Sequence, residues 1–231
     1  MAGKGIINLM SLKDQVYEYL RNEMKKGRIK PGSTINMDRT SEKLGVSKTP
    51  LRDALIRLEA EGFVNILPRK GVVVSPLSLQ NIRDYYQIIG ALESTAMLAA
   101  ESRLCGAADL MAELNDGMSQ ALAKENFDLY YERNLRFHEV FIRLSGNRMI
   151  EKTVDSMKKR LYDFPRPKDY IKAWEERSVE EHSSLVSLIK EGRVEEAARL
   201  IRDVHWSFKV QEPYILQYYA ACRTEGEERH E

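Results

Sequence analysis

Helical hydrophobic patterns are the only regular patterns from Ser78 to the C-terminus, and they restrict this part of the chain to an all-α fold. Apolar residues recur there at helical spacing, and the signals typical of strands disappear. Short breaks at Gly106, Gly146 and Gly192 separate consecutive segments, and short connections favour antiparallel neighbours. We therefore predict an antiparallel helical bundle, with helices over residues 79–104, 107–123, 126–145, 147–163, 170–191 and 194–221.

The first part of the chain begins with three shorter helical segments. Apolar residues lie at helical spacing over residues 12–24, and a second short helix is expected over residues 38–44. Gly45 marks a tight corner, after which Ser47 can cap a third helix that carries Pro50 in its first turn. Two helices around a glycine corner are typical of a helix-turn-helix.

A hairpin is predicted directly after the third helix. The apolar runs 63–66 and 72–74 are separated by a loop that contains Arg69 and Lys70. Such a basic hairpin is typical of a wing. We therefore predict a mainly α protein, with a winged helix-turn-helix over residues 1–78 and an all-helical domain over residues 79–231.

Charge is distributed unevenly, although the formal net charge of the chain is only +1. Residues 1–78 contain 14 Lys and Arg against 8 Asp and Glu, whereas the remaining residues contain 22 against 27. A basic first part joined to an acidic remainder indicates that only the N-terminal domain meets a polyanion such as DNA.

The third predicted helix has one apolar face and one polar face. The polar face presents Lys48, Thr49, Arg52, Asp53 and Arg57, with most of the cationic and hydroxyl groups near the N-terminal turns. In a helix-turn-helix these turns touch DNA, because arginine can pair with guanine in the major groove and free N–H groups can bind phosphate. We predict that this is the recognition helix.

The run LGVSKTPLRDAL at residues 44–55, with the Leu58–Gly62 segment and the Arg69-Lys70-Gly71 wing, resembles the DNA-binding domain of GntR-family regulators. The resemblance covers residues 11–76. It implies that Ser47, Lys48 and Arg52 contact DNA and that the wing around Lys70 and Gly71 enters the minor groove. Family members usually carry a DNA-contacting Arg at the start of the second helix. This chain has Asp38 there, and Arg39 is the expected substitute.

Three of the four histidines fall within predicted helices of the C-terminal domain. Asn134 and His138 are four residues apart and therefore project from one helix face. His182 lies ten residues before Gly192 and His205 thirteen after it. On antiparallel helices the positions of His182 and His205 along the helix axes would differ by about 4.5 Å. Three imidazoles and one amide oxygen could thus hold a divalent metal ion, or each histidine could be an ordinary core or surface residue.

These residues also resemble a known ligand-sensing domain. The Asn134–His138 segment, the Ser145–Asn147 corner, Glu181-His182 and the late His205 follow the order found in the FCD domain of the FadR subfamily within GntR, over about residues 79–221. The resemblance implies that a carboxylate and three histidines bind a metal ion, which in turn binds oxygen groups of an effector. Asn134 stands where the family has Asp, and it should bind a divalent cation more weakly.

The effector is expected to be a small organic or sugar acid. Ile89 stands where many members of the subfamily have an arginine that clamps an acidic effector. The effector is therefore less acidic, or another base replaces the clamp. The candidates for an effector-binding base are Arg136, Arg143 and Arg160.

The predicted function is a DNA-binding transcriptional repressor or activator whose operator affinity is changed by a metabolite bound at the metal site. In a second interpretation the metal ion itself is the signal, and in a third the protein is purely structural and its bundle only dimerises. A catalytic metal centre is disfavoured, because His138-Glu139 begins like the H-E-x-x-H motif of zinc proteases but the fifth residue is Ile142. We expect no enzymatic activity.

The partners and the compartment follow from simple arguments. A homodimer should read an inverted repeat in double-stranded DNA, because the symmetry of the protein dictates that of its site. A mixed set of imidazole and oxygen ligands suits Zn, Ni, Mn or Co. The two cysteines are too few for a disulfide framework, and no apolar run is long enough for a signal peptide or a membrane span. We expect a cytoplasmic protein without membrane contact.

Overall fold

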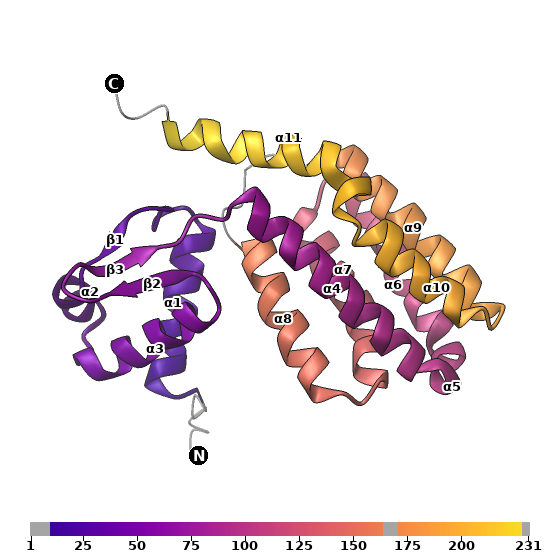
Figure 1. Ribbon diagram of the computed structural model, residues 1–231, viewed down its shortest axis with the longest axis horizontal. Coiled ribbons are helices and arrows are strands. Elements are labelled where there is room, and N and C mark those ends of the chain that lie inside the picture. The colour runs from indigo at the N-terminus through magenta and orange to yellow at the C-terminus, as the bar shows by residue number, and fades with distance from the viewer. Residues whose placement is uncertain (1–9, 164–170, 228–231) are drawn as a thin grey trace, which may run out of the picture. The chain divides into compact units, whose positions relative to one another are not determined.

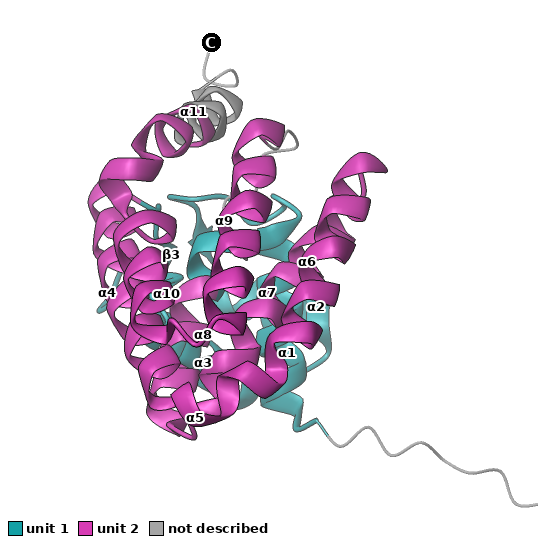
Figure 2. Cartoon of the chain, turned by 90° about the vertical axis from the view of Figure 1, so that its right-hand side faces the viewer, with its two compact units in different colours: residues 1–77, 159–166 teal, residues 78–158, 167–231 magenta. Residues whose placement is uncertain are grey.

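The computed structural model describes residues 10–163 and 171–227, and it divides the chain into two compact units. The first unit contains Met1–Leu77 and Lys159–Arg166, and the second contains Ser78–Lys158 and Pro167–Glu231 (Figure 2). The sequence placed a domain boundary between residues 78 and 79. It did not indicate that residues 159–166 join the first unit.

The first unit is a winged helix-turn-helix, as predicted (Figure 1). Its three strands form one antiparallel sheet in the order β1-β3-β2, and β2 and β3 make the expected hairpin. β1 is only two residues long, and the sequence analysis missed it. The elements are α1 (Leu12–Lys25), β1 (Thr34–Ile35), α2 (Met37–Leu44), α3 (Lys48–Ala60), β2 (Val64–Leu67) and β3 (Gly71–Val74).

The corner between α2 and α3 depends on a glycine. Gly45 follows the last residue of α2 with a φ of +64°, a left-handed conformation that ordinary side chains disfavour. The turn directs the apolar face of α3 into a core where Tyr17, Leu20, Leu51 and Leu58 are fully buried. Burial of each such side chain stabilises the fold by roughly 2 kcal/mol. This packing determines which face of α3 remains exposed.

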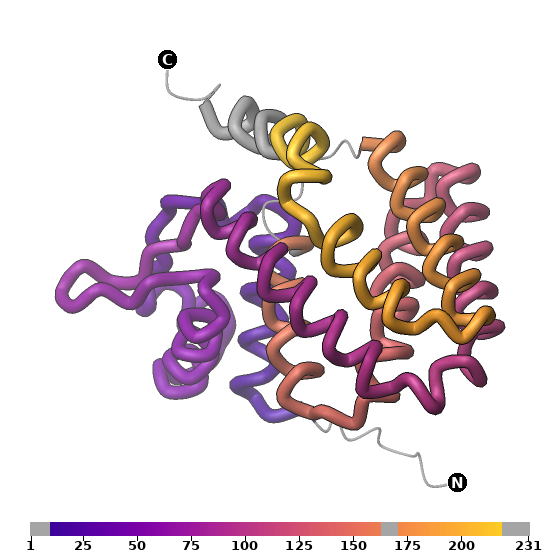
Figure 3. Tube along the Cα trace, turned by 45° about the vertical axis from the view of Figure 1, so that its right-hand side comes forward, coloured from indigo at the N-terminus to yellow at the C-terminus, as the bar shows by residue number. Residues whose placement is uncertain are grey.

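The second unit is all-helical, as predicted (Figure 3). α6 packs on α7 and α9, and α4 packs on α7 and α10, while α9 and α10 are joined by a reversal at Gly192, whose φ is +74°. No helix in the described part of the chain is long and apolar enough to cross a membrane. The elements are α4 (Leu79–Ala99), α5 (Glu101–Leu104), η1 (Cys105–Ala107), α6 (Ala108–Ala123), α7 (Phe127–Leu144), α8 (Arg148–Asp163), α9 (Lys172–Lys190), α10 (Val194–Leu200), η2 (Ile201–His205) and α11 (Phe208–Glu227).

The expectation of one continuous helix over residues 194–221 is wrong. The helix is interrupted by η2, a π-helical turn, and by a break at Trp206. The Trp206 ring is 3% exposed, and its Nε1 donates to Glu93 Oε2 at 2.7 Å. α4 approaches this turn closely, since a Cβ atom on Gly90 would lie 2.9 Å from Trp206 Cβ. A contact between distant residues therefore overrides the local helical pattern.

Candidate DNA-binding surface and histidine cluster

The N-terminal end of α3 presents exposed polar groups. Lys48, Thr49 and Arg52 are exposed, while Leu51 and Leu55 are buried beneath them. Ser47 is the N-cap residue of α3, but its side chain makes no capping hydrogen bond to the helix. The Ser47 hydroxyl and the free N–H groups of the first turn can therefore both bind a phosphate.

Lys48 forms an ion pair with Asp38 of α2, and both side chains are largely exposed. Arg39 is also exposed, and its main-chain N–H donates to Asn36 Oδ1, the N-cap of α2, at 3.0 Å. The acidic residue noted in the sequence thus lies against a candidate DNA contact. Any phosphate that binds Lys48 must compete with the Asp38 carboxylate.

Arg57 does not share the role of its neighbours on the polar face of α3. Its guanidinium lies 3.7 Å from the centre of the Tyr17 ring and contacts Glu61 at 3.2 Å and Asp14 at 3.4 Å. The contacts with Tyr17 and Asp14 join α3 to α1. Arg57 therefore stabilises the packing of the two helices.

The loop between β2 and β3 presents a basic tip. Arg69, Lys70 and Gly71 are all exposed. Lys70 N–H donates to the Leu67 carbonyl at 3.1 Å, and Arg69 and Gly71 have φ angles of +63° and +89°. A left-handed conformation is unfavourable for arginine by roughly 1–2 kcal/mol, and such strain is often found at functional positions.

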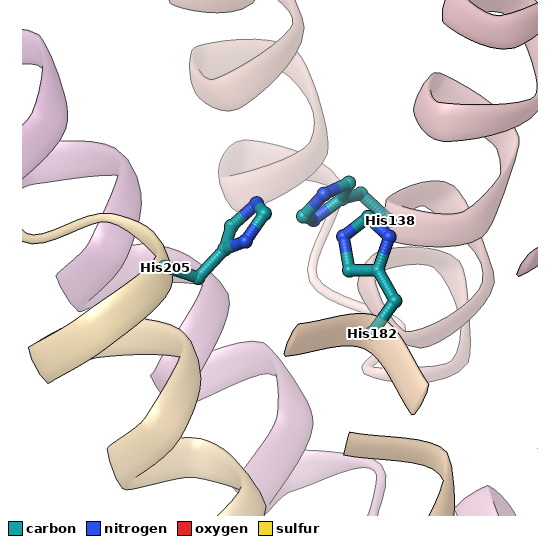
Figure 4. A group of neighbouring side chains, drawn as sticks. All are labelled: His138, His182 and His205. Atoms are coloured by element: carbon teal, nitrogen blue, oxygen red, sulfur yellow. The ribbon is translucent and has the colours of Figure 1, made fainter. Parts of the chain in front are cut away.

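Three histidines of the second unit point toward one another from three elements (Figure 4). His138 lies on α7, His182 on α9 and His205 at the end of η2. Their ring centres are 4.8 to 5.1 Å apart, and one candidate ligand atom from each lies within 4.8 Å of the others. His138 and His182 are fully buried. The spacing around Gly192 therefore does bring His182 and His205 together.

Two of these imidazoles are held by carboxylates that the sequence analysis did not single out. His138 Nδ1 lies 2.8 Å from Glu93 Oε2, and His205 Nδ1 lies 2.9 Å from Glu181 Oε2. A carboxylate at Nδ1 favours the tautomer that keeps its proton on Nδ1 and leaves a lone pair on Nε2. Metal-binding histidines are commonly oriented by this arrangement.

Each of these carboxylates also has a cationic neighbour. Lys158 Nζ of α8 lies 2.5 Å from Glu93 Oε1, with both side chains buried. Arg177 Nε donates to Glu181 Oε1 at 2.9 Å, and Gln211 Nε2 donates to the same oxygen at 3.1 Å. The histidines therefore lie among paired charges.

Several buried polar atoms of the cluster have no hydrogen-bond partner among the described residues. They are Asn134 Oδ1, His138 Nε2 and both ring nitrogens of His182. Burial without a partner costs roughly 1–3 kcal/mol for each such group. Asn134 Oδ1, His138 Nε2 and one ring nitrogen of His182 are donors that a divalent transition metal accepts, so the residues fit the metal site that the sequence suggested.

Burial also keeps the buried imidazoles uncharged. It lowers the pKa of His138 to about 3, although Glu93 opposes the change. Burial, with smaller contributions from His205 and His138, lowers the pKa of His182 well below its ordinary value. Burial would raise the pKa of Glu93, but His138 and Lys158 outweigh it and lower that pKa. Neutral imidazole is the form that binds metal ions.

Two protein families match the chain, and together they cover both units. Residues 12–74 match the bacterial regulatory proteins of the gntR family, and residues 84–205 match the FCD domain. The chain belongs to the GntR family and carries an FCD domain. Both families consist of transcriptional regulators, which confirms that this GntR-family protein is a DNA-binding transcriptional regulator and not an enzyme.

Relatives with names support the same assignment. The Nta operon transcriptional regulator of Aminobacter aminovorans is 31% identical over 179 residues, which are 74% of this chain and 80% of that protein. An HTH-type regulator of Agrobacterium vitis is 32% identical over 134 residues, or 54% of this chain and 76% of the relative.

Solved structures share the fold. Escherichia coli McbR/YncC has a TM-score of 0.67 at 22% identity, with 92% of this chain and 99% of that chain covered. Lar, which controls the agr system of Listeria monocytogenes, has a TM-score of 0.60 at 19% identity, with the same coverage of both chains. At this level of identity the likeness concerns the fold alone.

The three candidate effector arginines of this GntR-family regulator have different surroundings. Arg136 is exposed on α7. Arg143 is also exposed, and it pairs with Glu139 at 2.9 Å and Glu151 at 3.4 Å.

The prediction for Arg160 requires a correction. Its side chain is 1% exposed and lies in the first unit, where it donates to the Gly62 carbonyl at 3.0 Å and the Ser75 carbonyl at 2.8 Å. The guanidinium also lies 5.3 Å from the centre of the Phe63 ring. Arg160 thus binds main-chain acceptors of the first unit, which the sequence analysis did not foresee.

The sequence did contain a signal for Glu93 and Lys158. Glu93 lies on the apolar face of α4, among Ile89, Ala96 and Met97, and all four residues are buried. Lys158 continues the buried series of Val154 on α8 at a spacing of four. A charged residue on an otherwise apolar helix face usually has a buried partner. The pattern could have identified both residues but not the pairing.

Proposed function

We propose that this GntR-family regulator is a homodimeric repressor whose affinity for its operator changes when a metal ion and a small organic acid bind at the histidine cluster. One observation supports this most strongly: three imidazoles and a buried, unpartnered amide oxygen converge in the helical unit of a chain whose other unit is a winged helix-turn-helix. Because the proposed operators lie in chromosomal DNA, the proposed site of action is the cytoplasm.

On the DNA side, the N-terminal end of α3 enters the major groove. Ser47 and Thr49 bind phosphate there, while Lys48 and Arg52 contact phosphate or base edges. The remaining contacts come from the start of α2, through Arg39, and from the tip of the wing, through Arg69, Lys70 and Gly71. In a dimer with two-fold symmetry these surfaces read the two halves of an inverted repeat.

On the sensor side, His138, His182 and His205 bind the ion through ring nitrogens, and Asn134 binds it through Oδ1. The ion is Zn, Ni, Mn or Co, and it supplies a Lewis-acidic centre for oxygen atoms of the effector. Glu93 and Glu181 orient two of the imidazoles. The burial of the cluster excludes water from these contacts and strengthens them.

The test is elemental analysis of full-length protein purified without an affinity tag, combined with operator binding measured by fluorescence anisotropy. In buffer that contains acetate, we expect about one metal ion per chain in the natural protein and none in His182→Ala. Ser184→Ala, at an exposed position of the same helix, should retain the metal. An organic acid should change operator affinity of the metal-loaded protein but not of His182→Ala.

Two results would contradict the proposal. If the natural protein takes up no metal after incubation with Zn, Ni and Mn in the presence of acetate, the histidine cluster is not a metal site. If metal alone changes operator affinity and no organic acid adds to the change, the metal itself is the signal.

A further inference from the structure

The ligand set of the histidine cluster carries no net charge. Three of its members are imidazoles, which bind metal ions in their neutral form, and the fourth is the amide oxygen of Asn134. The donors themselves therefore contribute nothing that balances the two positive charges of a bound divalent ion.

The carboxylates beside the cluster do not supply the missing charge either. Glu93 is paired with Lys158 at 2.5 Å, and Glu181 is paired with Arg177 at 2.9 Å. The total charge of the Glu93–Lys158 pair is zero whether the shared proton lies on the amine or on the carboxylate. The orienting groups of the cluster are thus already compensated before any ion binds.

A divalent ion in this setting would be a buried charge without a counter-charge. Two of the three imidazoles and Asn134 are at most 5% exposed, so water screens the ion poorly. Uncompensated charges in a protein interior are strongly unfavourable. An anion that binds together with the metal ion would balance its charge and make binding favourable.

We infer that the cluster binds a divalent metal ion tightly only together with an anionic oxygen ligand, so that the metal ion and the effector are obligatory partners. The second ligand is then a small anion with oxygen donors, and one with two negative charges neutralises the site completely. This inference rests on the proposed metal site and specifies its ligand. By thermodynamic linkage, the anion raises the affinity for the metal by the same factor as the metal raises the affinity for the anion.

The consequence for regulation is a sensor that needs both ligands. Without the organic acid, the site loses its metal to competing cellular ligands. Without the metal, the neutral and largely buried donors offer an anion no positive charge. Asn134 is the residue responsible, because a carboxylate at this position would balance one charge of the ion permanently.

The test measures Ni²⁺ affinity of the full-length, tag-free protein by competition with a metallochromic indicator, with and without saturating acetate. Ionic strength is held constant with a weakly coordinating salt. We expect acetate to tighten Ni²⁺ binding by at least about tenfold, equivalent to about 1.4 kcal/mol. In Asn134→Asp, Ni²⁺ should bind more tightly without acetate, and the acetate effect should fall below about threefold.

A second variant checks the charge argument without altering a ligand. Lys158→Met leaves Glu93 uncompensated next to His138, so it should also reduce the effect of acetate, provided that circular dichroism shows a natively folded protein. Lys152→Met removes an exposed cation from the same helix and should retain the full effect. If Lys158→Met does not fold, Asn134→Asp and the natural protein still decide the question.

The outcomes separate this inference from the proposed function. If the natural protein binds Ni²⁺ equally tightly with and without acetate, the obligatory partnership is refuted while the metal site stands. An acetate effect that persists undiminished in Asn134→Asp also refutes it. If the natural protein binds no Ni²⁺ under either condition, the proposed metal site itself is overturned.

Discussion

Replacement of Arg160 by methionine should destabilise the first unit by about 3 kcal/mol or more. The guanidinium donates to the carbonyls of Gly62, which follows α3, and Ser75, which follows β3. Each hydrogen bond from a charged donor contributes about 1.5–3 kcal/mol, and both carbonyls lose this donor in the variant. Methionine retains much of the apolar volume of the arginine stem, so most of the effect comes from these hydrogen bonds.

The assay is urea-induced unfolding, combined with hydrogen exchange of the α3 amides, which reports on the first unit specifically. A loss of about 3 kcal/mol lowers the protection of these amides roughly a hundredfold. Arg143→Met is the matched control. Arg143 is 64% exposed and makes only surface ion pairs, so its replacement should change stability by less than about 0.5 kcal/mol.

The reasoning about Arg160 would be refuted by a variant that unfolds like the natural protein but no longer responds to organic acids. Such a result would restore Arg160 as an effector ligand. A variant that is destabilised and still binds the effector after folding would confirm the structural role.

Three further predictions concern the recognition surface and the close approach of α4 to η2. Arg52→Ala should weaken specific operator binding by roughly 1–3 kcal/mol in fluorescence anisotropy, and an unchanged affinity would mean that α3 is not the recognition helix. Asp38→Asn should strengthen DNA binding, because Lys48 becomes free to bind phosphate, and the plot of the logarithm of the DNA-binding constant against the logarithm of the salt concentration should steepen by about 1. An unchanged slope would exclude competition by Asp38. Gly90→Ala should lower stability by roughly 1–3 kcal/mol in thermal unfolding, because the added Cβ would lie 2.9 Å from Trp206 Cβ. Gly106→Ala, at a position with open space around it, should leave stability unchanged, and equal effects of the two substitutions would contradict the close packing.

Much of the DNA-binding unit could be predicted from sequence because its signals are local. The corner at Gly45, the cap position of Ser47 and the hairpin around Lys70 each depend on residues close together in the chain. The approach of His182 and His205 was also predictable, since Gly192 lies between them and helix geometry relates their heights. In each case the sequence separation is short enough for regular geometry to apply.

The features that were missed depend on residues far apart in the chain. β1 is two residues long and pairs with β3, from which it is separated by the whole recognition motif. Arg160 acts on carbonyls 85 and 98 positions earlier. The interruption at Trp206 depends on Glu93, 113 positions away. Neither periodicity nor propensity contains information about such contacts.

The histidine cluster can be distinguished from ordinary core packing by how its hydrogen-bonding groups are used. A histidine retained for packing is expected to satisfy both ring nitrogens when buried, because each unsatisfied group lowers stability. His138 Nδ1 lies within hydrogen-bond distance of Glu93, but His138 Nε2 has no hydrogen-bond partner among the described residues. Both ring nitrogens of His182 also lack a partner among these residues. Asn134, on the same helix as His138, has a buried Oδ1 atom that also lacks a hydrogen-bond partner among the described residues. Selection for stability alone would favour apolar residues at these positions, as it does at the neighbouring Phe137 and Phe141. A ligand that binds Asn134 Oδ1, His138 Nε2 and one ring nitrogen of His182 would satisfy three of these atoms, as the proposed metal site requires.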